Sequence, residues 1–304
     1  MQHLRRPAAA LAVVAVLSLA ALFLTGPRII QRLLNQPEAR QNGGAQPAEP
    51  SALQPPPPVR PPELQRLIDQ YNTPALLAAF RTSLSWRLPG EAENLAVAAR
   101  LLKGTVLQPG ETFSQNARLG PYTKKRGYGL GPMYVGNKIV KAEGGGVCQM
   151  ATTLFNAVVL ADLEIISRRP HSMTVPYVPP GQDATVATGK CDFIFRNNSQ
   201  DPILIWAEVI GDYEWLSVEF YSRHTAPQVV WHHQELKRYP YSTRYIPDQE
   251  LPTGVEKEII PGADGVTVKT WVEVTYPDGT TRIRNFGTHT YVPCPRVIRR
   301  GTKS

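Results

Sequence analysis

One cysteine in this sequence has the neighbours expected of a nucleophile. Cys148 follows three consecutive glycines, Gly144, Gly145 and Gly146, and precedes a run of apolar residues with helical spacing. The thiol is therefore expected in the first turn of a helix, where unpaired backbone N–H groups and the helix dipole favour an anion. Such a position lowers the pKa of a thiol and makes it a better nucleophile at neutral pH. The glycines let a substrate or another backbone segment come close.

A thiolate nucleophile needs a base or an imidazolium partner, and usually a third group that orients the imidazole. Of the six histidines, His171 is the one that closely follows the expected helix, and Pro170 before it favours extended or turn geometry. Asp183 stands on a turn before an expected strand. We therefore predict Cys148, His171 and Asp183 as catalytic residues. The alternatives are a cysteine that only fills space, a histidine that caps a carbonyl, and an aspartate that closes an Asx turn.

Polar residues of the same expected helix are candidates for substrate contact. They either complete an oxyanion hole with the backbone N–H of Cys148 or form internal hydrogen bonds that fix the helix. The candidate substrate-binding residues are Gly144, Gly145, Gly146, Gln149, Thr152, Thr153, Asn156 and Ser172.

Metal and redox chemistry are the rival interpretations. His232 and His233 are adjacent, but no further ligand stands at compact spacing around them, so we predict no metal and no cofactor. A disulfide between Cys191 and Cys294 leaves Cys148 free, whereas Cys191 as a resolving partner of Cys148 makes the site a redox-active thiol.

The N-terminal part of the chain predicts export. Arg5 and Arg6 precede an apolar run from Ala8 to Leu24, which is at the short edge of the roughly 17–25 residues that span a bilayer. We expect residues 1–27 to be an uncleaved signal-anchor or else a cleaved signal peptide. Residues 28–62 are expected to form a Pro-rich linker. The bulk of the protein is then extracytoplasmic, on a single-pass anchor in the cell membrane or secreted.

The elements around the candidate residues predict an α+β fold. Helical spacing occurs at 63–71 and 91–103, and a further short helix is expected at 74–84. A hairpin at 133–140 leads to the glycine run. Antiparallel strands are expected at 163–168, 191–196, 203–210 and 213–221.

Two domains follow from this pattern. Residues 63–223 are expected to form a mixed α/β domain with an antiparallel sheet. Residues 224–304 are rich in proline and polar residues up to Gly254 and then contain a hairpin between 266 and 286, which predicts a small all-β module. The net charge of +8 favours an anionic lipid or wall polymer as partner. Nucleic acid is disfavoured because no stripe of basic residues is interleaved with aromatic ones.

The motifs occur together, in this order, in a known family. From about Asn94 to Trp206 the sequence resembles the VanW domain, a family named after vancomycin-resistance clusters and widespread in exported bacterial proteins. The segments that carry the resemblance are residues 104–114, Gly120-Pro121, Arg126-Gly127-Tyr128, residues 144–157, Pro170-His171-Ser172, residues 177–181, residues 183–186 and residues 195–198. The end of the chain, from Tyr291 to Thr302, resembles a G5 domain, a small β module associated with the binding of wall sugars.

The resemblance implies a function. Members of the family are linked to L,D-transpeptidation of peptidoglycan, with the cysteine of the Gly-Gly-Gly-Val-Cys-Gln motif, here Cys148, as nucleophile. We therefore expect a cysteine acyltransferase that acts on peptidoglycan stem peptides, with peptidoglycan or another anionic wall polymer and the membrane as partners. The alternative is a non-catalytic wall-binding or accessory protein with a structural cysteine.

Overall fold

The computed structural model describes residues 60–85, 89–135 and 138–303. The expected signal segment at 1–27 and nearly all of the expected linker at 28–62 lie outside the described residues. Within the described ranges, no helix is long and apolar enough to cross a membrane.

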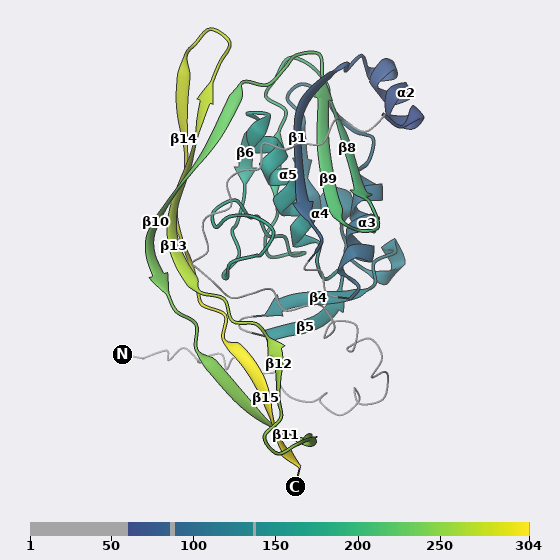
Figure 1. Cartoon of the computed structure of the whole chain (residues 1–304). Coiled ribbons are helices and arrows are strands. Elements are labelled where there is room, and N and C mark those ends of the chain that lie inside the picture. Colours follow the sequence, from purple (N-terminus) through teal and green to yellow (C-terminus); the bar gives the residue numbers. More distant parts are fainter. Residues whose placement is uncertain (1–59, 86–88, 136–137, 304) are drawn as a thin grey trace, which may run out of the picture. The chain divides into compact units, whose positions relative to one another are not determined.

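A four-stranded antiparallel sheet forms the centre of the first domain (Figure 1). Its strands, in spatial order, are β1 (Ala75–Ser83), β9 (Trp215–Ser222), β8 (Ile203–Ile210) and β2 (Thr105–Leu107). The strands expected at 203–210 and 213–221 are confirmed as β8 and β9. The helix expected at 74–84 is wrong, because this segment is β1. Pairing with β9 along nearly its whole length outweighs the helix propensity of its alanines and leucines.

Helices cover both faces of this sheet. α2 (Pro62–Tyr71) packs Leu64 and Ile68 against Leu204 and Trp206 of β8. α3 (Glu91–Leu102) and α5 (Cys148–Leu160) lie on the opposite face, where α3 contacts β8 and α5 contacts β1 and β9. β8 is buried on both faces, since successive side chains of a strand point to opposite sides. The helices expected at 63–71 and 91–103 are confirmed.

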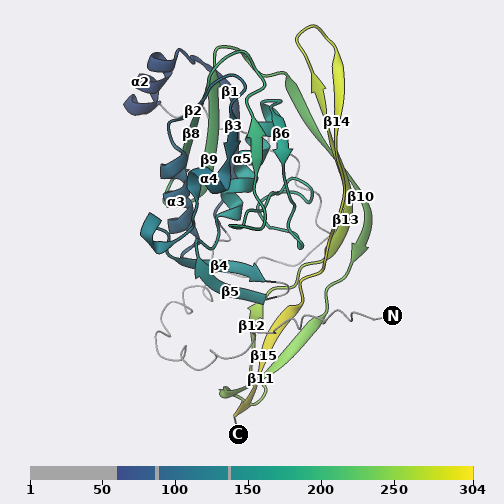
Figure 2. The same ribbon diagram turned by 180° about the vertical axis from the view of Figure 1, so that it is seen from behind.

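Smaller elements lie beside the four-stranded sheet and α5 (Figure 2). A second sheet has the order β3 (Thr112–Ser114), β7 (Ile194–Arg196) and β6 (Glu164–Ser167). The expected hairpin is present as β4 (Leu130–Val135) and β5 (Lys138–Glu143). α4 (Gln115–Leu119) and the short 3-10 helix η1 (Lys124–Arg126) connect β3 to this hairpin.

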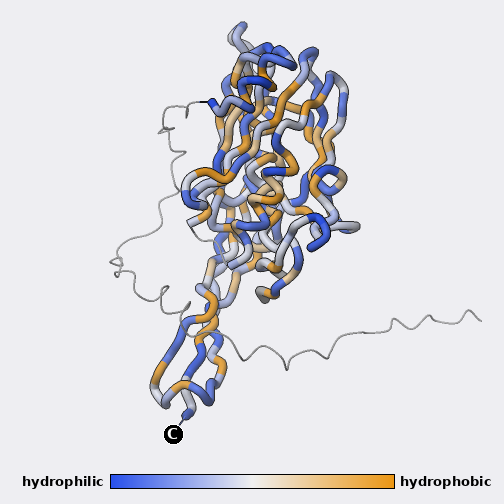
Figure 3. Tube along the Cα trace, turned by 90° about the vertical axis from the view of Figure 1, so that its right-hand side faces the viewer, coloured by the Kyte–Doolittle hydropathy of each residue, from blue (hydrophilic) through white to orange (hydrophobic). Residues whose placement is uncertain are grey.

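The C-terminal part is all β, as predicted. One sheet has the order β10 (Gln228–Tyr239), β13 (Gly265–Thr275) and β14 (Thr281–Tyr291), and it contains the expected hairpin. The other has the order β11 (Thr243–Pro252), β15 (Arg296–Lys303) and β12 (Glu256–Ile260), with β11 and β15 parallel. Figure 3 shows apolar and polar residues interspersed along the strands near the C-terminus. Strands β10 and β11 lie between residue 224 and Gly254, a stretch for which the sequence predicted no strand.

The first C-terminal sheet shares the core of the first domain. Val272 and Val274 of β13 are fully buried in the same apolar cluster as α5. The ring of Phe155 in α5 contacts Trp231 and Phe286, with ring centroids 6.0 and 5.6 Å apart. β13 and β14 are therefore held against the helix that begins at Cys148.

Candidate active site

The glycine run places Cys148 at the first residue of α5, as predicted. Gly144 and Gly146 have φ angles of 69° and 98°, in the left-handed region that favours glycine. A Cβ atom at Gly144 would lie 2.4 Å from Cβ of Tyr122, and one at Gly145 would lie 2.2 Å from the carbonyl carbon of Gly131. The turn packs against backbone atoms and against the side chains of Tyr122 and Glu91, so the close approach that the glycines permit is intramolecular in this structure.

The thiol of Cys148 is partly buried and contacts His171. Its Sγ lies 3.4 Å from the backbone oxygen of Val186. Burial raises the pKa of this thiol, but the hydrogen bond and the positive charge of His171 outweigh that effect, so that the net pKa is lowered. The thiol therefore ionises more readily than an ordinary cysteine.

Asp183 orients the imidazole of His171. Nδ1 of His171 lies 2.7 Å from Oδ2 of Asp183, and the backbone N–H of His171 donates to the same oxygen at 2.6 Å. Burial lowers the pKa of His171, but the hydrogen bonds to Asp183 and Cys148 outweigh it and raise this pKa to about 9. Since the pKa of the thiol falls while that of the imidazole rises, the two groups favour a thiolate–imidazolium pair.

Asp183 is itself held in place from several sides. Its side chain is 1% exposed, and Oδ1 accepts a hydrogen bond from the hydroxyl of Tyr291 at 2.5 Å. Arg168 donates to the backbone oxygen of Asp183 at 2.7 Å and approaches Oδ1 at 3.4 Å. Burial raises the pKa of Asp183, but the hydrogen bond and charge of His171 together with the Tyr291 hydroxyl outweigh it, so the pKa is lowered. The carboxylate therefore stays ionised.

The loop that carries Asp183 differs from the expected turn and strand. The residues from Asp183 to Val186 form no strand, and a single β-bridge joins Ala187 to Cys191. The backbone N–H of Thr185 donates to the oxygen of Arg169 at 2.8 Å. This hydrogen bond ties the loop to the segment that carries His171.

The four polar residues of α5 are buried and bonded within the protein. Gln149 donates to Thr82 and to the backbone oxygen of Ser83, both at 2.9 Å. Thr152 exchanges hydrogen bonds with the backbone of Ala184, Thr153 donates to the oxygen of Gln149, and Asn156 donates to the oxygen of Gln182. These contacts match the alternative of internal hydrogen bonds.

Those bonds also explain how the site is assembled. Thr152 and Asn156 fix the 182–184 segment against α5, which brings Asp183 beside the start of the helix. Ser172 is exposed, and its backbone oxygen accepts a hydrogen bond from the N–H of Val292 at 2.7 Å.

Further residues near the site were not among the candidates that the sequence predicted. Burial raises the pKa of the phenols of Tyr122 and Tyr177, and the charge of Cys148 raises both pKa values further. Arg168 packs over the ring of Phe155 at 4.8 Å while it binds the Asp183 loop. Tyr291 comes from β14, which is far away in the sequence.

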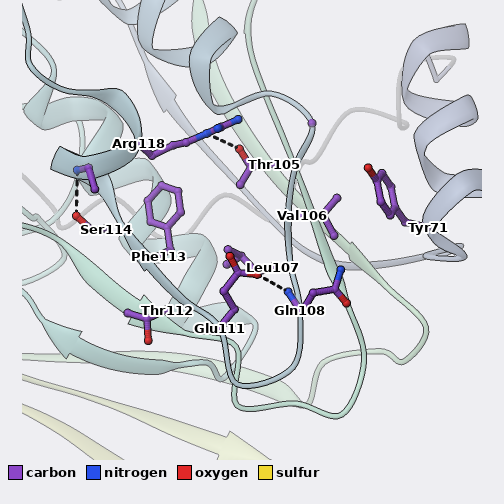
Figure 4. Close-up of a pocket in the computed structure, with 12 residues that line it drawn as sticks. Tyr71, Thr105, Val106, Leu107, Gln108, Glu111, Thr112, Phe113, Ser114 and Arg118 are labelled. Atoms are coloured by element: carbon purple, nitrogen blue, oxygen red, sulfur yellow. Dashed lines mark hydrogen bonds between the residues drawn. The ribbon is translucent and has the colours of Figure 1, made fainter.

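One pocket of the first domain lies away from these residues. Figure 4 shows a pocket between β2, β3 and α4 whose lining includes Tyr71, Thr105, Phe113 and Arg118. Its lining residues include none of the catalytic candidates. Among the described residues, no three His, Cys, Asp or Glu side chains gather in a way that could hold a metal ion. All three cysteines are free thiols.

Comparisons with known proteins match the two parts of the chain separately. The family model described as VanW like protein matches residues 90–221, and that of the G5 domain matches residues 232–303. An uncharacterized protein YoaR of Bacillus subtilis (strain 168) is 44% identical over 120 residues, which are 40% of this chain and 40% of YoaR. The vancomycin B-type resistance protein VanW of Enterococcus faecalis (strain ATCC 700802 / V583) is 34% identical over 118 residues, 37% of this chain and 43% of that protein. The chain therefore spans about two fifths of the length of these relatives.

A solved structure described as an IgA1 protease G5 domain is 18% identical, with a TM-score of 0.18, and the match covers 27% of this chain and 98% of that one.

Proposed function

Because this chain carries a VanW-like domain at residues 90–221 and a G5 domain at residues 232–303, we propose that it is an exported cell-wall protein that performs cysteine-dependent acyl transfer on peptidoglycan stem peptides. The observation that supports the activity is the continuous set of contacts from Cys148 through His171 to Asp183 at the start of α5. The match to a relative named for vancomycin resistance supports the setting in the cell wall.

The first half-reaction forms a thioester. The thiolate of Cys148 attacks the carbonyl carbon of the amide bond between an L- and a D-residue of a donor stem. The backbone N–H of Cys148, in the first turn of α5, stabilises the oxyanion of the tetrahedral intermediate. The N–H groups of Val147 and Gln149 already donate to the backbone oxygens of Gly144 and Gly146. The imidazolium of His171 gives its proton to the leaving amine as the C–N bond breaks.

The second half-reaction releases the product. Neutral His171 takes a proton from the amine of an acceptor stem, which attacks the thioester carbonyl. The C–S bond breaks, the thiolate and the imidazolium are restored, and a cross-linked product leaves. Water as acceptor makes the same site a carboxypeptidase. Asp183 stays ionised throughout and holds the imidazole in one orientation.

The full chain incubated with tetrapeptide muropeptides tests this proposal, with products read by mass spectrometry. We expect cross-linked or trimmed products from the parent and none from Cys148→Ala. Cys191→Ala is the matched control, because Cys191 is also a partly buried free thiol, and it should keep the activity. Equal inactivity of the folded parent and Cys148→Ala, with both pelleting with cell-wall sacculi, would favour the alternative of a non-catalytic binding protein.

A further inference from the structure

The hydroxyl of Tyr291 is the contact through which the C-terminal part of the chain reaches the candidate site. Tyr291 is the last residue of β14, within the region that matches the G5 domain, while Asp183 lies within the VanW-like region. The Tyr291 hydroxyl donates to Oδ1 of Asp183 at 2.5 Å and accepts from the backbone N–H of Gly181 at 2.8 Å. It therefore bridges the two ends of the short segment that carries the carboxylate.

The two carboxylate oxygens of Asp183 have different hydrogen-bond partners. Oδ2 accepts both hydrogen bonds from His171, whereas Oδ1 accepts from Tyr291. A carboxylate held at both oxygens cannot rotate about its side-chain bonds, so the hydrogen bond from Tyr291 fixes the direction in which Asp183 meets the imidazole.

The surroundings of Tyr291 keep its hydroxyl in place as a hydrogen-bond donor to Asp183. The side chain of Tyr291 is 1% exposed, and its ring packs with Val266 and Val268 of β13. Burial raises the pKa of its phenol, and the charge of Asp183 raises it further, so the hydroxyl keeps its proton and remains a donor. The neighbouring His289 on β14 lies 3.1 Å from Arg168, the other residue that faces Oδ1. Residues of β14 thus lie beside both groups that face this oxygen.

We propose that Tyr291 is a positioning residue of the Cys148–His171–Asp183 site, so that the C-terminal region supplies part of the active site of the first domain. This inference rests on the proposed acyl transfer. Arg168 alone cannot replace the hydroxyl in this geometry. Its Nη2 lies 3.4 Å from Oδ1 and donates at 2.8 Å to the backbone oxygen of Gly181, and its Nε donates to the backbone oxygen of Asp183.

The substitution Tyr291→Phe in the full chain tests the proposal, because it keeps the ring and removes the hydroxyl. Tyr276→Phe is the matched control. Tyr276 also lies in the C-terminal region, and its hydroxyl donates at 2.7 Å to Asp162 of the first domain, away from Cys148. The first readout is the pH dependence of Cys148 alkylation, which reports the thiol directly. The second is the kinetics of muropeptide conversion.

For Tyr291→Phe we expect the midpoint of Cys148 alkylation to rise by about one pH unit, the scale of one hydrogen bond to a charged group. We expect kcat to fall about tenfold with KM unchanged. Tyr276→Phe should match the parent in both measurements. The proposal would be overturned if Tyr291→Phe had the same alkylation midpoint and kcat as the parent. It would also be overturned if the midpoint of Tyr276→Phe shifted as far as that of Tyr291→Phe.

A second measurement needs no variant. In the parent protein, the hydroxyl proton of Tyr291 should give a far-downfield proton NMR signal that shifts as the His171–Asp183 pair titrates. A signal indifferent to that titration would also overturn the proposal. If the parent converts no muropeptide, the proposed function fails, but the alkylation midpoints and the NMR titration still decide the role of Tyr291.

Discussion

The thiol of Cys148 and the imidazole of His171 change each other's protonation. The pKa of the thiol is lowered and that of the imidazole is raised to about 9, and in each case the partner outweighs the effect of burial. Cys294 has no such partner, and burial alone raises its pKa. The reactivity of Cys148 therefore depends on His171 rather than on solvent exposure.

Alkylation by iodoacetamide measures this dependence. In the parent, Cys148 should react at pH 7 well before Cys294, because the pKa of Cys148 is lowered and that of Cys294 is raised. In His171→Ala the midpoint of Cys148 alkylation should move toward the ordinary thiol value of about 8.5. His224→Ala is the control, since His224 forms a similar pair with Asp201 at 2.9 Å outside the site. Equal midpoints in His171→Ala and the parent would contradict the ion pair.

Asp183 should contribute to stability in a pH-dependent way. Its pKa in the folded protein lies below the ordinary value of 3.8, so the unfolded chain binds more protons as the pH falls through this range. The contribution is present above about pH 4 and is lost as the pH falls through the folded pKa.

We expect Asp183→Asn to lower the free energy of unfolding by about 3–5 kcal/mol at pH 7, since it leaves the buried Arg168 without its carboxylate. The loss should shrink on acidification. Urea unfolding between pH 3 and 7 measures this, with the exposed Asp212→Asn as control. A loss of unfolding free energy in Asp183→Asn that stays constant with pH would contradict the lowered pKa of Asp183.

At the scale of elements, the start of α5 was predictable and its surroundings were less so. The glycine run before a helical pattern sufficed to place Cys148 at the first turn, and His171 and Asp183 followed from order and residue type. β1 was not predictable, because the alanines and leucines of this segment also suit a helix and its pairing with β9 is a long-range contact. Nor was Tyr291, since 108 residues separate it from Asp183 and no local pattern marks it.

The glycine turn gives a prediction at the same scale. In Gly145→Ala, the added Cβ would lie 2.2 Å from the carbonyl of Gly131, so the β4–β5 hairpin or the turn must shift. We expect a loss of about 1–3 kcal/mol in unfolding free energy and slower alkylation of Cys148. Gly129→Ala is the control, because its nearest neighbour would be 3.9 Å away. Equal stability of the two variants would show that the turn does not constrain the site.

At the scale of the whole molecule, the described part of the chain is held together across the boundary between its two regions. Phe286 of β14 stacks on Trp231 with centroids 4.9 Å apart and contacts Phe155 of α5. Tyr276 and Arg282 both bind Asp162, which follows α5. Because these contacts end near the helix that carries Cys148, the C-terminal region is part of the structure that positions the site.

Calorimetry of the full chain tests this coupling. We expect one cooperative transition for residues 60–303 and a loss of about 2–3 kcal/mol in Phe286→Ala, in line with the partial burial of the ring. Ile283→Ala on the same strand is the control, since Ile283 is 52% exposed. Two separate transitions, with the first domain unchanged in Phe286→Ala, would contradict a shared core.

The most direct test of the central claim is to trap the acyl-enzyme. The full chain is mixed with tetrapeptide muropeptides, quenched in acid after a short interval, and digested for peptide mass spectrometry. We expect a thioester adduct of the donor stem on the peptide that contains Cys148, and no adduct on the peptides of Cys191 or Cys294. A folded parent that turns over muropeptides without an adduct on Cys148, or with the adduct on another residue, would contradict the central claim.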